Sequence, residues 1–166
     1  MIGHCLDSVT FVAEKLVVDC GSTDGTQEIA AAHGARVVTQ PWLGFGPQRN
    51  FASSQATHDW ILTLDADEVL TSDLIEEMRA RLPDLLQSTD TAGAILSRKT
   101  LYMGKPMRWY KPMRAERISR LHHRGRVSVP LVFAGRRGGY RGGPRRVPHR
   151  RRAGGTAGLD LLGADR

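Results

Sequence analysis

Short apolar runs separated by amphipathic segments fill the first two-thirds of the chain. Runs with the length and β-branched content of buried strands are predicted at residues 15–19, 36–39, 60–65 and 94–98. Segments with helical spacing are predicted between them at residues 26–33, 48–56 and 72–82. Because strands and helices alternate, the pattern predicts an α/β fold with a mostly parallel sheet and flanking helices.

Capping residues mark the ends of the predicted helices. Thr23 or Asp24 can cap the start of the first helix, and Gly34 can close its end. Ser72 is expected to cap the third helix and Pro83 to end it. These bounds therefore rest on side-chain chemistry as well as on periodicity.

Two of the predicted strands run into acidic residues. The segment 19–26 contains Asp19 and Asp24, and the segment 65–68 contains Asp65 and Asp67. Ligands of open parallel sheets bind beyond the carboxyl ends of the strands, where both segments are expected to lie. Paired aspartates can hold Mg²⁺ or Mn²⁺ with substrate phosphates, and a carboxylate at a strand end can bind ribose hydroxyls. A solvated turn and ordinary helix capping remain the alternative interpretations.

The formal net charge of +7 is distributed unevenly. Residues 1–113 carry 10 Lys and Arg against 14 Asp and Glu, whereas residues 114–166 carry 14 against 3. Residues 125–166 contain ten glycines, three prolines and no lysine, which leaves too little apolar surface to offset the entropy of ordering. We therefore predict a folded domain at residues 1–126 and a disordered basic tail at residues 127–166.

Compartment and cysteine chemistry are also constrained by the sequence. No apolar run approaches the ~18 residues needed to span a bilayer, and Met1 is not followed by the pattern of a signal peptide. This predicts a cytoplasmic protein. Cys5 and Cys20 have no neighbouring ligand at metal-site spacing, so we expect reduced thiols with structural roles.

Three motifs, taken in order and spacing, resemble those of the inverting family 2 glycosyltransferases of the GT-A fold. They are VVDCGSTDGT at 17–26, PWLGFGPQRNFA at 41–52 and DWILTLDADE at 59–68. The bacterial members that add sugars to the lipopolysaccharide core are the most similar. The resemblance covers about residues 4–126. It implies a GT-A-like, Rossmann-like fold.

The resemblance also implies an activity and a site. A sugar would pass with inversion from a nucleotide-diphosphate donor of the UDP type to a glycan or lipid-linked acceptor of the lipopolysaccharide core or a related glycan. A lipid-linked acceptor would bring the protein to the surface of the inner membrane. Mg²⁺ or Mn²⁺ would stabilise the departing diphosphate. The residues implied to bind donor are Asp19, Ser22, Asp24, Arg49 and Asp65, and those implied to hold the metal are Asp65 and Asp67.

The start of the chain departs from this family. Members begin with a strand inside the sheet, whereas residues 1–6 fall in the helix expected after that strand. The sequence therefore predicts an N-terminal truncation that leaves one edge of the strand at 15–19 unpaired.

The later part of the chain departs as well. The catalytic residue is not identified, because no clear carboxylate base follows the metal motif. Glu116 is the nearest candidate, and its pairing with a neighbouring arginine is the alternative. The change in composition after Arg126 suggests the hypothesis of a shifted reading frame.

Two other functions remain open. The chain could be an inactive fragment that binds donor without transferring sugar. The basic tail could instead bind nucleic acid or an anionic surface in a salt-dependent way. Its only aromatic residues are Phe133 and Tyr140, which are too few for a stacking platform, so we expect no specific nucleic-acid partner.

Overall fold

The computed structural model describes residues 1–102, 105–106, 116–127 and 159–163. The helices are α1 (Ile2–Asp7), α2 (Thr26–Ala32), α3 (Phe45–Gln55) and α4 (Ser72–Gln87). The strands are β1 (Leu16–Asp19), β2 (Arg36–Thr39), β3 (Trp60–Leu62), β4 (Thr91–Arg98), β5 (Leu101–Tyr102), β6 (Lys105–Pro106), β7 (Glu116–His123) and β8 (Leu159–Gly163). The α/β class predicted from the sequence is therefore confirmed.

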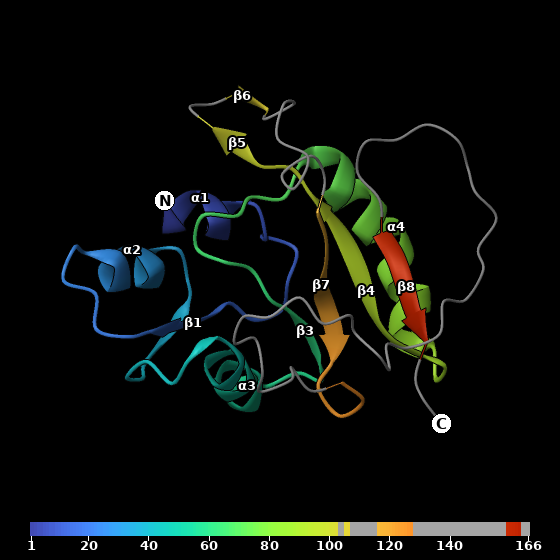
Figure 1. Ribbon diagram of the computed structural model, residues 1–166, viewed down its shortest axis with the longest axis horizontal. Coiled ribbons are helices and arrows are strands. Elements are labelled where there is room, and N and C mark those ends of the chain that lie inside the picture. The colour runs from blue at the N-terminus through green and yellow to red at the C-terminus, as the bar shows by residue number, and fades with distance from the viewer. Residues whose placement is uncertain (103–104, 107–115, 128–158, 164–166) are drawn as a thin grey trace, which may run out of the picture.

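A parallel pair of strands, β1 and β2, forms the first half of the domain (Figure 1). The register places Leu16 opposite Arg36 and Asp19 opposite Thr39. The connecting helix α2 begins after Gly25, whose φ of 82° lies in the left-handed region that favours glycine. The chain turns out of the helix at Gly34, as predicted, with a φ of 77°.

A four-stranded sheet in the order β3-β7-β4-β8 forms the other half. All of its pairings are antiparallel, which differs from the mostly parallel sheet that the alternating pattern predicts. The cause is β7, which lies between β3 and β4 although it follows both in the sequence. β5 and β6 form a separate antiparallel pair.

The structure also differs from the prediction for the tail. Residues 159–163 form β8 on the edge of β4, where the sequence predicts disorder. This short segment is Leu-Asp-Leu-Leu-Gly, with three leucines in five residues. Apart from it and Val127, the predicted tail at 127–166 lies outside the described residues.

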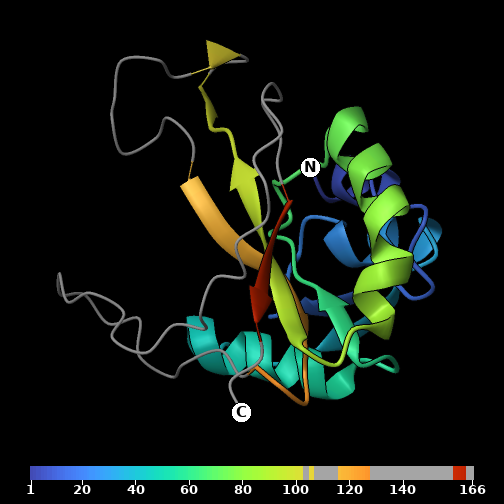
Figure 2. The same cartoon turned by 90° about the vertical axis from the view of Figure 1, so that its right-hand side faces the viewer.

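Two hydrophobic clusters form the core. The larger joins one face of α4 to the sheet, and Figure 2 shows α4 lying along that face. Its buried members are Val9, Leu70, Leu74, Met78, Leu85, Ala94, Leu96 and Leu121. The smaller contains Ile2, Leu6, Ala30 and Ala35, packed against Val17 of β1 and Val37 of β2. The segment that begins with α1 thus contributes to both clusters, because Ile2 and Leu6 lie in one and Val9 in the other.

Helices α3 and α4 are longer than predicted. α3 begins at Phe45, three residues before the predicted start, and α4 continues to Gln87 with Pro83 inside it. Leu85, which lies beyond the proline, is only 3% exposed. Burial of this side chain offsets the loss of one helical hydrogen bond at proline. The cap of α4 is Thr71 rather than Ser72, and its hydroxyl accepts from the Leu74 N–H at 3.4 Å.

Among the described residues, β1 pairs with β2 alone and β3 pairs with β7 alone. None of the helices in the described ranges has the length and apolar content required to cross a bilayer.

Candidate active site

The carboxylate of Asp19, at the end of β1, organises the loop that leads to α2. The residue is only 6% exposed. Its Oδ2 accepts the backbone N–H groups of Gly21 at 2.8 Å and Ser22 at 2.7 Å, and the Gln27 side-chain amide at 2.8 Å. Its Oδ1 accepts the Ser22 hydroxyl at 2.5 Å. These donors hold the pKa of Asp19 below its usual value, with the Ser22 hydroxyl making the largest contribution.

The remaining predicted residues of this loop lie close to Asp19. Ser22 is exposed, and both its backbone N–H and its hydroxyl bind the Asp19 carboxylate. Asp24 is exposed and accepts the Thr26 N–H at 3.2 Å. The N-cap of α2 is Gly25 and no side chain caps this helix, so the prediction that Thr23 or Asp24 caps it is wrong. The loop is therefore shaped by bonds among its own residues.

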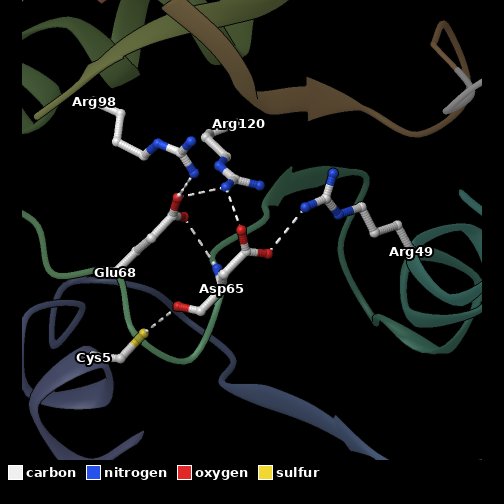
Figure 3. A network of polar contacts seen from close by, with 6 residues as sticks. All are labelled: Cys5, Arg49, Asp65, Glu68, Arg98 and Arg120. Atoms are coloured by element: carbon white, nitrogen blue, oxygen red, sulfur yellow. Dashed lines mark hydrogen bonds and ion pairs between the residues drawn. The ribbon is translucent and has the colours of Figure 1, made fainter. Parts of the chain in front are cut away.

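Asp65 lies between two guanidinium groups (Figure 3). Its Oδ1 accepts from Arg49 Nη2 at 3.0 Å, and its Oδ2 accepts from Arg120 Nη2 at 2.6 Å. Partial burial acts to raise the pKa of Asp65, but the two arginines outweigh it and hold that pKa below its usual value. The structure thus unites two predicted residues, Arg49 and Asp65, in one ion pair.

Glu68 and a third arginine, Arg98, complete this network. Glu68 Oε1 accepts from Arg120 Nη2 at 2.5 Å and from Arg98 Nη1 at 3.2 Å. Its Oε2 accepts the backbone N–H of Asp65 at 3.1 Å, and its own N–H binds the Asp65 carbonyl at 2.9 Å. Arg120 and Glu68 therefore fix both the backbone and the carboxylate of Asp65.

Sequence reasoning did not assign site roles to Glu68, Arg98 or Arg120. Arg120 lies within β7, and its side chain is only 5% exposed. A buried charge requires a partner, but β7 is a mostly polar strand, so its sequence does not mark Arg120 as buried. The partners of Arg120 could not be predicted from the sequence. Asp65 and Glu68 precede it by 55 and 52 residues, and β4 lies between them and Arg120 in the sequence.

Cys5 is the nearest thiol to this network. Its Sγ–H donates to the Asp65 carbonyl at 3.6 Å. Burial, with a smaller effect of Glu68, raises the pKa of the thiol, so Cys5 is a neutral packing residue. Cys20 is exposed, and neither cysteine forms a disulfide.

The two residues predicted to hold a metal, Asp65 and Asp67, lie on one turn. Asp67 is exposed, and the Asp65 side chain is 41% exposed. In the part of the chain that the structure describes, no third His, Cys, Asp or Glu joins them to make a metal-binding cluster. A pair of carboxylates fits Mg²⁺ or Mn²⁺ where substrate phosphates and water complete the coordination. Oδ1 of Asp65 is bound to Arg49 in this structure.

Glu116, the candidate base, is the first residue of β7 and pairs in register with Arg98. Its side chain lies outside the described residues.

Comparisons with known proteins agree with the motifs. The profile described as Glycosyl transferase family 2 matches residues 1–148. This match extends beyond Arg126, the position at which the sequence motifs predict the end of the resemblance and the hypothesised shift of reading frame.

Two of the three relatives described here are named glycosyltransferases. The lipopolysaccharide core biosynthesis glycosyltransferase LpsC of Rhizobium meliloti is 34% identical over 138 residues, which are 78% of this chain and 48% of LpsC. An uncharacterized glycosyltransferase of Rickettsia felis is 46% identical over 78 residues, which are 46% of this chain and 28% of that protein. A TPR repeat-containing protein of Synechococcus elongatus is 41% identical over 93 residues, covering 54% of this chain and 23% of that protein.

The chain spans less than a third of the rickettsial relative and about half of LpsC. No solved structure matches it. The profile match over most of the chain, together with the identity to LpsC, shows that the chain belongs to glycosyltransferase family 2, and hence to the GT-A fold.

Proposed function

We propose that the chain is the donor-binding part of a metal-assisted, inverting glycosyltransferase. The donor is a nucleotide-diphosphate sugar of the UDP type, and the acceptor is a glycan of the lipopolysaccharide core or a related glycan. Support for this acceptor class comes from the printed name of LpsC, a relative that this chain covers over 48% of its length.

The observation that carries the proposal is the geometry around Asp65. Its carboxylate is anchored by Arg120 on one oxygen and remains 41% exposed, next to an exposed Asp67 and the half-exposed Arg49. Carboxylates and a guanidinium together suit a magnesium or manganese diphosphate. We assign Asp65 and Asp67 to the cation and Arg49 to the diphosphate. When bound, the cation would stabilise negative charge on the departing nucleoside diphosphate.

The loop after β1 is assigned to the nucleoside. Asp19 Oδ1 accepts the Ser22 hydroxyl at 2.5 Å and has a second lone pair on which a ribose hydroxyl can donate. Asp19 also fixes the backbone of Gly21 and Ser22, and so presents Ser22 and Asp24 at the exposed side of the loop. In this proposal Asp19 both contacts the donor and shapes its binding loop.

The transfer step requires a base. An acceptor hydroxyl forms the new bond to the anomeric carbon as the bond to the diphosphate breaks, and its proton passes to a carboxylate. Glu116 is the candidate that this chain offers for that role. A lipid-linked acceptor would place the reaction at the inner surface of the membrane.

Calorimetric titration of UDP in the presence of Mn²⁺ tests the donor assignment. We expect binding by the unmodified chain and loss of its metal-dependent part in Asp65→Ala and in Asp67→Ala. Asp59→Ala is the matched control, because Asp59 lies before β3, at the opposite end from Asp65, and its side chain is 62% exposed. Failure of the unmodified chain to bind UDP with Mn²⁺ would contradict the proposal.

A transfer assay with a UDP-sugar separates the enzyme from the donor-binding alternative. Transfer that decreases in Glu116→Gln, with UDP binding unchanged, supports Glu116 as the base. The expected decrease is about 10²- to 10⁴-fold. Binding of UDP without any transfer would favour a donor-binding module that needs further sequence for catalysis.

A further inference from the structure

The two arginines on Asp65 differ in how freely each can move. Arg120 has a side chain only 5% exposed, and its Nη2 binds both Asp65 Oδ2 and Glu68 Oε1. Arg49 has a side chain 35% exposed and reaches Asp65 Oδ1 from α3 at 3.0 Å. Withdrawing Arg120 would leave a buried charge unpaired, whereas withdrawing Arg49 exposes both partners to water.

We propose that Arg49 exchanges partners when donor binds. In the free protein its guanidinium binds Asp65 Oδ1. On binding of a nucleoside diphosphate it moves to the phosphates, which leaves Oδ1 for the divalent cation, while Arg120 keeps Oδ2 in place. This inference rests on the proposed function, because it takes Asp65 and Arg49 as parts of the donor site.

The chemistry of the groups favours this exchange. A half-exposed Arg–carboxylate pair contributes little free energy, so it is easily broken. A guanidinium matches the oxygens of a phosphate in a bidentate way, and a diphosphate carries more charge than one carboxylate. The ring of bonds through Arg120, Glu68 and the Asp65 N–H keeps the carboxylate oriented after Arg49 has left. Arg120 is therefore a positioning residue and Arg49 a ligand-binding one.

The exchange has an unusual consequence. Without metal, Asp65 competes with the diphosphate for Arg49, so removal of the Asp65 charge should strengthen the binding of UDP. The gain should depend on Arg49. Asp65→Asn is the suitable variant, because its amide oxygen can still accept from Arg120 and so preserve the fold.

A cycle of four proteins tests this in EDTA by phosphorus NMR titration with UDP. These are the unmodified chain, Asp65→Asn, Arg49→Gln and the double variant. We expect Asp65→Asn to bind UDP about fivefold tighter than the unmodified chain, which corresponds to breaking one half-exposed ion pair. In the Arg49→Gln background the same change should have an effect below about twofold.

A matched control comes from the other end of β3. Arg124 Nε binds Asp59 Oδ1 at 3.0 Å, and its side chain is 34% exposed, close to the values for Arg49 and Asp65. Arg124→Gln should leave both UDP binding and the effect of Asp65→Asn unchanged. Melting temperatures of all variants establish that they are folded.

The outcomes separate the inference from the proposed function. Equal strengthening of UDP binding in both backgrounds would show a general charge effect and overturn the exchange. Weaker binding of UDP by Asp65→Asn than by the unmodified chain would also overturn the exchange. In either case, metal-dependent binding of UDP by the unmodified chain would keep the proposed function intact. Absence of UDP binding both with Mn²⁺ and in EDTA would overturn the two together.

Discussion

Asp19 ends β1 and Asp65 follows β3, yet their carboxylates receive hydrogen bonds from different parts of the chain. The donors to Asp19 are neutral groups two, three and eight residues away. The donors to Asp65 are two guanidinium groups 16 and 55 residues away. One carboxylate is held by its own loop and the other by the assembled fold.

This difference separates two kinds of contribution to a site. The loop around Asp19 needs only β1 and the start of α2 to form its bonds. The position of Asp65 needs β7 to lie beside β3, because Arg120 belongs to β7. We therefore expect perturbations near Asp65 to affect the whole domain and perturbations near Asp19 to remain local.

The largest effect is expected from Arg120→Met. The change leaves Glu68 and Asp65 without their shared buried cation, and should lower the free energy of unfolding by about 3 kcal/mol. Urea unfolding followed by tryptophan fluorescence measures it, since Trp60 lies in the neighbouring β3. A loss below about 1 kcal/mol would show that water replaces Arg120 at these carboxylates.

An intermediate effect is expected from Asp19→Ala. Four hydrogen bonds within one loop lose their acceptor, and the free energy of unfolding should fall by about 2 kcal/mol. Hydrogen exchange should increase at the amides of Gly21 and Ser22 and stay unchanged in β7. An increase of exchange throughout β7 would contradict the local nature of this loop.

The sequence predicts the Asp19 region well because its determinants are neighbours in the chain. The turn in which Asp24 accepts the Thr26 N–H, and the left-handed turn at Gly34, follow from residue chemistry over a few positions. The strand at 36–39 agrees with β2 for the same reason, because a short β-branched run between turn residues specifies it locally. The sequence also predicts a candidate site at the acidic turn 65–68.

The arginines that contact the turn at 65–68, Arg98 and Arg120, could not be predicted, because their positions depend on strand pairing. The antiparallel register of β3 with β7 places Leu62 opposite Leu121, a separation of 59 residues, and no local pattern encodes it. The continuation of α4 through Pro83 also depends on tertiary contacts. Burial of Leu85 in the core outweighs the tendency of proline to end a helix. The predictions that remain untested are the ligand roles of these residues.

A smaller effect, and one that depends on pH, is expected from Ser22→Ala. The pKa of Asp19 is lower in the folded protein than its usual value, so this carboxylate stabilises the fold above the unfolded pKa of about 3.9. That stability is lost as pH falls through the folded pKa. Removing the Ser22 hydroxyl should raise the Asp19 pKa and lower stability at pH 7 by about 1 kcal/mol.

Carbon NMR titration of the Asp19 carboxyl measures the change in pKa, and urea unfolding at pH 7 and at pH 3 measures the change in stability. The cost of Ser22→Ala should be smaller at pH 3 than at pH 7, because Asp19 of the variant has the higher pKa and takes up a proton at a higher pH than Asp19 of the unmodified chain. An equal cost at both pH values would show that the hydroxyl stabilises the loop independently of the charge of Asp19.

The smallest effect on stability is expected from Arg49→Gln, although the arginine binds the same carboxylate as Arg120. The Arg49–Asp65 pair is half-exposed, so its loss should lower the free energy of unfolding by about 0.5 kcal/mol, and by less at high salt. Urea unfolding at two salt concentrations measures it, with Arg124→Gln as the matched exposed pair. Donor binding should depend on Arg49 far more strongly than folding does, because its proposed partner in the complex is the diphosphate. A cost as large as that of Arg120→Met would instead make Arg49 part of the structural frame, and an arginine required for the fold could not leave Asp65 when donor binds.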